Sequence, residues 1–485
     1  MESKLGLNKI FTSFNCKLIF LIIPFLNEIP LLMPVFNSLM KGGMFFAAAY
    51  IIYDLFTRRE TFKMSFILPS IILIASIFIG TALNYSSPQL KMNIIELLYV
   101  ITSLIVLLQV PENYTKEQCY KEIRIINFIL IVLITITSVV SLIMYYSKIT
   151  FEITYNNYTY RMGVYNGRLV GLFRNSIYPT AAIGTICGFV QLFVNREYYN
   201  LKSCAKNKLI VASIIINANV TLLQNSKGIF IGLLCAVFFV LFFVFAKYEK
   251  LYFIRKRPLP IQITAAVMGG GAGAAVVRLA ALIGKKINYC ILFLISFFSD
   301  KFSNNGEAYK KIGDNVKEYM ERTVGEQYGM LTGRPYIWMT GLKSFLKQPL
   351  FGYGPYTLAD TIRPYEGSTE QISHFHNILI HTLVSGGVIG LTAFLVITVC
   401  SAVVLIKSLW KNSSRKDYIA FVLMISMIVF MFVINMADTT ILYMTKHSGF
   451  VFFIYLGYIL ALSGEKREFI FDRPIRILGE KIAKK

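Results

Sequence analysis

The stretch "ILIHTLVSGGVIGLTAFLVITVCSAVVLI" (residues 378–406) contains no Asp, Glu, Lys or Arg. An apolar helix of about 20 residues crosses the ~30 Å hydrocarbon layer of a bilayer, so this run is long enough to span a membrane. It directly follows "SHFHN" (residues 373–377), and residues 374–381 hold three of the four histidines of the chain. The imidazoles are therefore expected at the mouth of a membrane helix.

Similar apolar windows recur along the 485 residues, which are 55% hydrophobic and 15% charged. The strict alternation of polar and apolar residues that is typical of membrane β-barrels is missing. We predict an all-α polytopic membrane protein with about twelve transmembrane helices. The first span is interrupted by Asn27, Glu28 and Pro30, and we interpret it as a retained helix because no small-residue cleavage site follows. The expected spans are 17–37, 40–57, 65–82, 92–109, 124–146, 176–195, 209–224, 228–246, 261–283, 376–406, 418–436 and 448–464.

The chain has a net charge of +23, and the predicted topology explains where most of its Lys and Arg residues lie. Lys and Arg are dense in short connections between the spans, which the positive-inside rule assigns to the cytoplasm. This placement argues against nucleic acid as a partner. The seven cysteines form no C-x-x-C pair, which argues against a zinc ribbon or a disulfide framework. The basic segments are 58–64, 196–208, 247–258, 407–417 and the predicted cytoplasmic tail 465–485.

Residues 1–485 are interpreted as a single membrane domain, because the chain contains no repeat and no low-complexity linker. Two connections, 147–175 and 285–375, are long, and both fall on the outer side in this topology. The second is expected to contain short helices, one of them amphipathic, from Arg334 to a stop at Pro349. Long connections on one face of a bundle commonly carry function.

Four cationic side chains are predicted on this outer face, where the positive-inside rule does not explain them. They share this face with His376, where the chain enters the membrane, and Asn377, Trp338 and His374 are expected to support them. Arg and Lys at a membrane boundary suit a lipid-linked phosphate or diphosphate, because a guanidinium pairs with two phosphate oxygens. The predicted cations are Arg168, Arg174, Lys227 and Arg334.

The order of short motifs resembles the O-antigen ligase and O-antigen polymerase superfamily of bacterial membrane glycosyltransferases. The resemblance covers about residues 165–395. The motifs are R-x-x-G-x-F (168–173), S-K-G (226–228), G-R-x-x-x-W (333–338), P-x-x-G-x-G (349–354), H-N-x-L (376–379) and G-x-x-G (387–390).

The resemblance implies a GT-C-like enzyme of the bacterial cytoplasmic membrane, with its active site on the extracytoplasmic side and no metal or other cofactor. Its donor would be a glycan on undecaprenyl diphosphate, and its acceptor a glycan or a glycolipid. A flippase and a chain-length regulator are candidate partners. His376 would be the catalytic base, and Arg334 and Lys227 would hold the diphosphate with Arg168 nearby.

Two positions depart from the family pattern. Lys227 stands where the family commonly has arginine, so a two-oxygen contact is lost. Ser385 stands where a glutamate often occurs, so that glutamate's orienting role cannot be transferred. The remaining outer carboxylates, Asp360, Glu366, Glu370 and Asp438, are rival bases that spacing does not rank.

Structural alternatives remain for each of these residues. His376 could cap a helix or join His374 and His381 at a metal, although positions 376 and 381 lie on different helix faces. His381 is expected to pack inside the bundle. Arg334 could be a surface charge at a helix start, Arg168 and Arg174 could anchor headgroups, and Lys227 could be solvated.

Two features of the span 261–283 also have structural interpretations. Gly269 and Gly273 have the G-x-x-x-G spacing of closely packed helices. Arg278 is expected to extend to the outer boundary, with lining of the lipid path as the alternative.

Polymerisation of surface or capsular polysaccharide is the favoured function, with O-antigen ligation as the alternative. A lipid-linked oligosaccharide flippase is the alternative of another class, but flippases place charges in a central cavity and show repeats. A peptidoglycan-type polymerase would use a carboxylate base.

Overall fold

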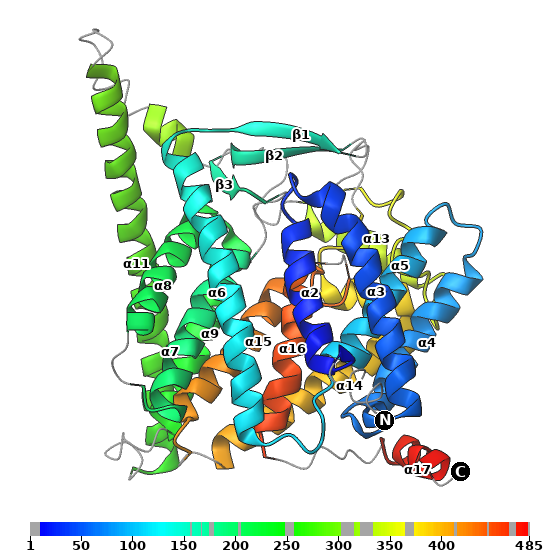
Figure 1. The fold of residues 1–485 in the computed structure, drawn as a ribbon. Coiled ribbons are helices and arrows are strands. Elements are labelled where there is room, and N and C mark those ends of the chain that lie inside the picture. The colour runs from blue at the N-terminus through cyan, green and yellow to red at the C-terminus, as the bar shows by residue number, and fades with distance from the viewer. Residues whose placement is uncertain are drawn as a thin grey trace.

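The computed structural model describes residues 10–483 except for 156–157, 166, 174–178, 202–204, 248–256, 302–314, 321–332, 364–372, 412–414, 444–445 and 465–471. Figure 1 shows long helices that run side by side, with a small sheet across one end of the bundle (the sheet end) and helix α17 (Arg473–Ala483) at the other. The bundle helices are α2 (Ser13–Asn27), α3 (Met33–Phe56), α4 (Ile67–Leu83), α5 (Leu90–Ile101), α6 (Lys116–Tyr146), α7 (Thr180–Phe193), α8 (Ala205–Leu223), α9 (Lys227–Lys247), α11 (Leu259–Lys301), α14 (Ile378–Lys411), α15 (Tyr418–Asn435) and α16 (His447–Leu462).

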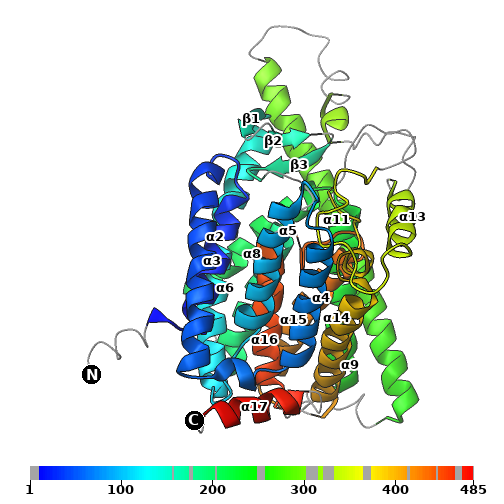
Figure 2. The same cartoon turned by 90° about the vertical axis from the view of Figure 1, so that its right-hand side faces the viewer.

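Short helical segments complete the fold. The π-helical turns η2 (Thr102–Leu107) and η3 (Val194–Tyr198) extend α5 and α7. The 3-10 turn η1 (Glu60–Lys63) connects α3 to α4, and α13 (Arg334–Phe345) precedes α14. Figure 2 shows α13 beside the upper part of the bundle.

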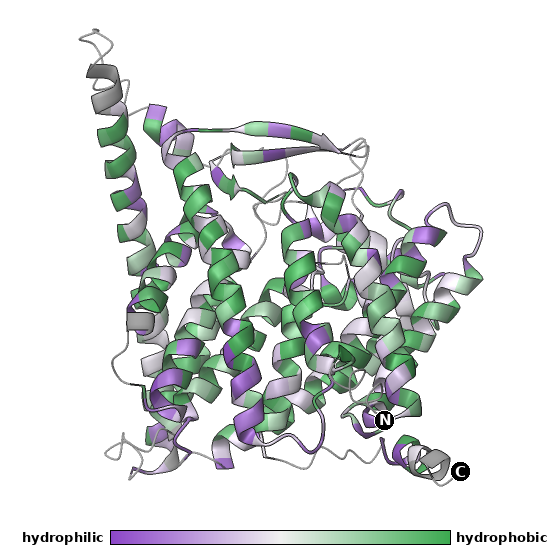
Figure 3. Cartoon of the chain, viewed as in Figure 1, coloured by the Kyte–Doolittle hydropathy of each residue, from purple (hydrophilic) through white to green (hydrophobic). Residues whose placement is uncertain are grey.

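The helical bundle has the composition of a multi-pass membrane protein. Within the described residues, seven helices are long and apolar enough to cross a membrane, and four further apolar helices are shorter. Figure 3 shows hydrophobic residues along the bundle helices and many hydrophilic residues toward their ends. Each expected span overlaps at least one of the bundle helices. The count of twelve crossings and the side on which each end lies stay predictions.

The first two expected spans were divided at the wrong place. Helix α2 ends at Asn27 and α3 begins at Met33, so the break falls in 28–32 rather than at 38–39. Pro30 has no backbone N–H to continue α2, and a second proline occupies the first turn of α3, where no N–H is needed. Glu28 turns inward and accepts a hydrogen bond from the backbone N–H of His447 at 3.0 Å.

The connection 147–175 contains strands that the all-α prediction did not include. Strands β1 (Phe151–Tyr155), β2 (Tyr158–Tyr165) and β3 (Arg168–Gly171) form an antiparallel sheet in the order β1-β2-β3. Its last strand is joined to α6, since the Leu172 N–H donates to Ser141 Oγ at 3.3 Å.

Helix α11 continues beyond the predicted membrane boundary. Residues 285–301 were assigned to the outer loop, but they belong to this single helix of 43 residues, which at 1.5 Å per residue is about 65 Å long. Figure 1 shows it rising past the sheet. The prediction for Gly269 and Gly273 is confirmed, because a Cβ on either would meet Phe245 or Leu241 of α9 within 2.3 Å. Arg278 lies on the exposed face of α11.

Helix α14 is interrupted at Gly387, whose φ of 64° and ψ of −168° are not helical. At the interruption, backbone N–H and carbonyl groups lose their partners within the helix, and inside an apolar bundle such groups need other hydrogen-bond partners. The P-x-x-G-x-G segment provides them. Tyr353 N–H donates to the Val384 carbonyl at 2.9 Å, Gly354 N–H donates to the Ser385 carbonyl at 2.9 Å, and the Pro349 carbonyl accepts from the Val388 N–H at 2.8 Å. Backbone hydrogen bonds therefore join the P-x-x-G-x-G segment (349–354) to the interruption at the start of the G-x-x-G segment (387–390). We call this pair of segments the backbone joint.

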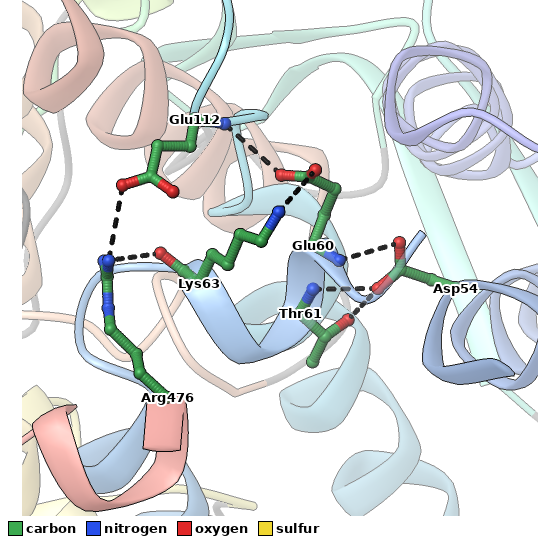
Figure 4. A network of polar contacts seen from close by, with 6 residues as sticks. All are labelled: Asp54, Glu60, Thr61, Lys63, Glu112 and Arg476. Atoms are coloured by element: carbon green, nitrogen blue, oxygen red, sulfur yellow. Dashed lines mark hydrogen bonds and ion pairs between the residues drawn. The ribbon is translucent and has the colours of Figure 1, made fainter. Parts of the chain in front are cut away.

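At the opposite end, α17 is joined to the α3–α4 connection by the polar network in Figure 4. Arg476 donates to the Lys63 carbonyl at 2.6 Å and lies 3.3 Å from Glu112. Asp54 accepts from the Thr61 N–H at 2.8 Å. The C-terminal helix thus lies at the end remote from the sheet, where the basic connections were predicted.

Candidate functional site

The site is built around the turn by which the chain enters α14. His376 has a φ of 49°, the left-handed region that non-glycine residues rarely adopt. Its N–H donates to His374 Nδ1 at 3.2 Å, and the two ring centroids are 3.9 Å apart. His374 is buried, while His376 is half-buried. A strained backbone that presents a half-buried imidazole is typical of functional sites.

Asn377 fixes this turn in two directions. Its Oδ1 accepts from the N–H groups of Leu379 and Ile380 at 3.0 and 3.2 Å, which caps the first turn of α14. Its Nδ2 donates to the Met436 carbonyl at 3.0 Å, in the connection between α15 and α16. The expected supporting role of Asn377 thus has a structural basis, and the α15–α16 connection is drawn to the histidines.

That connection contributes Asp438. A carboxylate oxygen of Asp438 and one nitrogen each of His374 and His376 all lie within 4.8 Å of one another. Asp438 is buried, and its Oδ1 also accepts from the Thr439 N–H at 2.9 Å. Of the four rival carboxylates, Asp360 instead accepts from Gln89 at 2.8 Å, while Glu366 and Glu370 lie outside the described residues. Sequence reasoning did not single out Asp438, although it is the only acidic residue between α15 and α16.

Burial and, to a smaller degree, the surrounding charges shift the pKa of the histidines. Burial lowers the pKa of His376 to about 4; the Asp438 carboxylate opposes this effect, and the charges of Arg334 and Lys446 add to it. Burial also lowers the pKa of His374 well below its ordinary value, helped by the charges of His376 and Lys446. Both imidazoles are therefore neutral near pH 7 and have a lone pair that can accept a proton. Lys446 was not identified from the sequence, although it is the only basic residue between α15 and α16.

Helix α13 brings Arg334 to this group. Arg334 is the first residue of the helix, after Gly333 with a φ of 75°. Ile337, Ile362, Phe375 and Val384 form a small apolar core, and a Cβ on Gly341 would lie 2.8 Å from the Phe375 ring. The helix therefore packs directly on the histidine segment. The indole N–H of Trp338 is buried and has no hydrogen-bond partner among the described residues.

His381 has the packed role that was predicted for it. It is 2% exposed, its ring centroid lies 4.5 Å from that of Tyr443, and its Nδ1 faces the Phe375 N–H at 3.5 Å. Its ring therefore contacts the backbone of Phe375, the residue between His374 and His376.

The other predicted cations form a second group at the sheet end. Arg168 begins β3 and Lys227 begins α9, where it is exposed. Asn225 links the two segments, because its Nδ2 donates to the Gly167 carbonyl at 3.5 Å and its Oδ1 accepts from Lys285 at 3.0 Å. Lys285 was missed because residue 285 was assigned to a loop. Arg174 lies outside the described residues.

Two imidazoles and one carboxylate are also a ligand set that zinc accepts, so His374, His376 and Asp438 could hold a metal ion. This differs from the trio weighed from the sequence, because Asp438 takes the place of His381. The adjacent charges of Arg334 and Lys446 disfavour a cation at this point and favour an anion. The geometry best suits an anionic substrate group next to a neutral base.

Comparison with known proteins agrees with the resemblance. A family model described as O-Antigen ligase matches residues 212–395, a range that includes Lys227, Arg334 and His376 but neither Asp438 nor Lys446. A search of curated proteins finds no relative of the chain. The match confirms the resemblance to the O-antigen ligase and polymerase superfamily and indicates a membrane enzyme that transfers glycans.

Proposed function

From the O-antigen ligase match over residues 212–395, we propose that the protein moves a glycan from undecaprenyl diphosphate to an acceptor hydroxyl on the outer face of the bacterial cytoplasmic membrane. The favoured reaction joins repeat units of a surface or capsular polysaccharide. The observation that carries the proposal is the neutral His376 with Asp438 on one side and the charge of Arg334 in reach.

The reaction needs one displacement. The acceptor oxygen attacks the anomeric carbon and forms the new glycosidic bond, while the bond from that carbon to the diphosphate oxygen breaks and its electron pair leaves with the diphosphate. The hydroxyl proton passes to His376, and the Asp438 carboxylate stabilises the imidazolium that results. Attack opposite the leaving group inverts the anomeric configuration. Arg334 faces the charge that develops on the diphosphate, a role a fixed cation can perform without a metal.

Donor binding would also raise the pKa of the catalytic base, His376. In the free site, burial lowers the pKa of His376 to about 4, and the charges of Arg334 and Lys446 add to this effect, so the imidazole is a weak base. A bound diphosphate offsets these charges and raises the pKa of His376 toward the range where it accepts a proton well. Catalysis would then depend on the donor being in place.

The sheet and α13 lie toward one end of the bundle, and α17 lies at the other (Figures 1 and 2). The histidine turn packs against α13. Of the predicted basic connections, 58–64 contacts α17 through the Lys63 carbonyl. This arrangement supports an extracytoplasmic site, where lipid-linked donors are present and nucleotide sugars are not.

Changing Arg334 should weaken donor use. We expect Arg334→Ala to raise the KM for a diphosphate-linked donor about 10- to 100-fold, because a hydrogen bond to a charged group is worth roughly 1.5–3 kcal/mol. Arg334→Lys should recover only part of this loss, since an ammonium lacks the two-oxygen fork. Initial rates of the purified protein at varied donor concentration measure the effect. Unchanged KM and kcat in both variants would remove Arg334 from the site.

Changing Asp438 should affect the chemical step instead. Asp438→Asn keeps the size of the side chain but removes the charge that opposes the fall in the pKa of His376. We expect kcat to fall about 10- to 100-fold with little change in KM, as a nearby unit charge is worth a few kcal/mol at the effective dielectric of a protein. Single-turnover rates at saturating donor test this. A larger change in KM than in kcat would instead place Asp438 in substrate binding.

Proteoliposomes separate this function from a flippase. The purified protein is given a lipid-diphosphate oligosaccharide and acceptor, and both product formation and movement of the lipid between leaflets are followed. Longer glycans support polymerisation, transfer to a different lipid supports ligation, and translocation without new glycosidic bonds overturns the proposal.

A further inference from the structure

We propose that Lys446 is a second phosphate-binding side chain of the site, so that Arg334 and Lys446 together select a diphosphate over a monophosphate on the donor. The proposal rests on the proposed function and names the substrate group that this site takes. No motif of the sequence and no part of the matched range 212–395 includes Lys446.

Lys446 ends the same connection between α15 and α16 that brings Asp438 to the histidines. At one end, Met436 accepts the hydrogen bond from Asn377, the residue after His376. Asp438, two residues further, reaches both imidazoles within 4.8 Å. Lys446 ends the connection as the N-cap residue of α16, with extended φ and ψ of −97° and 145°.

The residue after Lys446, His447, is fixed by buried contacts with Glu28. His447 Nδ1 lies 2.8 Å from Glu28 Oε2, and its backbone N–H donates to Glu28 Oε1 at 3.0 Å. Both side chains are at most 1% exposed, and the Phe25 ring packs edge-on to His447 at 5.3 Å. A displaced Lys446 backbone would disrupt these contacts, so its position at the start of α16 is well determined.

The charge of Lys446 belongs to the site. Its side chain is only 6% exposed, although burial of an ammonium is costly inside a membrane protein. Its charge acts on His374 and on His376, as that of Arg334 does. Arg334 comes from α13 and Lys446 from α16, so the imidazoles experience positive charge from two separate elements.

A diphosphate has two phosphate groups, and this arrangement offers one cation for each. The fork of a guanidinium pairs with oxygens of one phosphate, while an ammonium serves the other as a point charge. A lipid monophosphate could engage only one of the two cations fully.

The test measures binding without turnover. Inorganic pyrophosphate, inorganic phosphate, farnesyl diphosphate and farnesyl monophosphate are titrated into the purified protein, and the shift in its unfolding temperature is recorded. We expect Lys446→Met to weaken pyrophosphate and farnesyl diphosphate binding about tenfold or more, with much less effect on the monophosphates. Lys446→Arg should bind within a few-fold of the unchanged protein.

Lys343→Met is the matched control, because Lys343 is an exposed lysine on α13, the helix that carries Arg334. It should bind every probe as the unchanged protein does. If Lys446→Met does not fold, Lys446→Gln, which can still donate hydrogen bonds, is measured in its place.

The pH dependence of kcat/KM is a second measurement, which tests whether Lys446 lies near His376. Removal of a positive charge raises the pKa of His376, so the acid limb of kcat/KM should move to higher pH in Lys446→Met. Unchanged diphosphate preference in that variant overturns the proposal. If Arg334→Ala weakens pyrophosphate binding and Lys446→Met does not, only the assignment of Lys446 fails. If neither variant changes binding, the proposed function fails with it.

Discussion

His376→Ala is expected to lower kcat about 10²- to 10⁴-fold, the usual contribution of a positioned general base, while the KM for the donor changes little. Asn377 rather than His376 caps α14, so the backbone turn has an anchor that the substitution leaves in place. The diphosphate would still bind to Arg334, but the acceptor hydroxyl would have no imidazole to take its proton. Single-turnover measurements on purified protein show this loss directly.

Exogenous imidazole and a pH profile make the test specific. Imidazole should restore part of the activity of His376→Ala, because the deletion leaves a space beside Asp438. In the unchanged protein, kcat/KM should fall as pH drops through about 4, since the free enzyme loses its base when His376 is protonated. His374→Asn is the comparison variant and should not be rescued. Full activity of His376→Ala would falsify the mechanism.

The sequence predicted the parts of the fold that depend on local composition. Runs such as 418–436 are apolar enough to identify a membrane helix without knowledge of its neighbours, and α15 occupies Tyr418–Asn435. The end of α11 was placed wrongly because Lys285 and Lys286 look like a membrane boundary, whereas the helix continues past them. A charge shows where a side chain needs water, not where a backbone stops being helical.

Only part of the site was predicted, because the sequence shows local composition and motifs but not contacts between residues remote in the chain. Arg334 and His376 were placed together from motif order, and the structure brings them within electrostatic reach. Asp438 and Lys446 lie in a connection of ordinary length between two spans, with no motif around them. Contacts between residues remote in the chain bring that connection to the histidines, among them the hydrogen bond from Asn377 to Met436 and the ring contact of His381 with Tyr443. A contact between residues so far apart in the chain produces no local sequence pattern.

Gly387→Ala is expected to have the largest effect on stability. Its φ of 64° with ψ of −168° is a region that essentially only glycine occupies, at a cost of about 1–3 kcal/mol for other residues. A Cβ would also lie 2.1 Å from the Leu350 carbonyl oxygen, a backbone atom that cannot turn aside. The 349–354 segment would have to leave the interruption in α14. We therefore expect a loss of at least about 3 kcal/mol, seen as a much lower unfolding temperature or no folded protein.

Two further glycines separate this joint from a general effect of the substitution. Gly352→Ala should be equally harmful, since its φ is 62° and its Cβ would lie 2.2 Å from the Val384 carbonyl oxygen. Gly42→Ala in α3 has nothing within 4 Å of the added Cβ, so it should be neutral or stabilising by up to about 1 kcal/mol. Equal unfolding temperatures for the three variants would show that the interruption is not needed for folding. A lower temperature for Gly387→Ala and Gly352→Ala alone would show that the two motifs form one joint beneath the histidines.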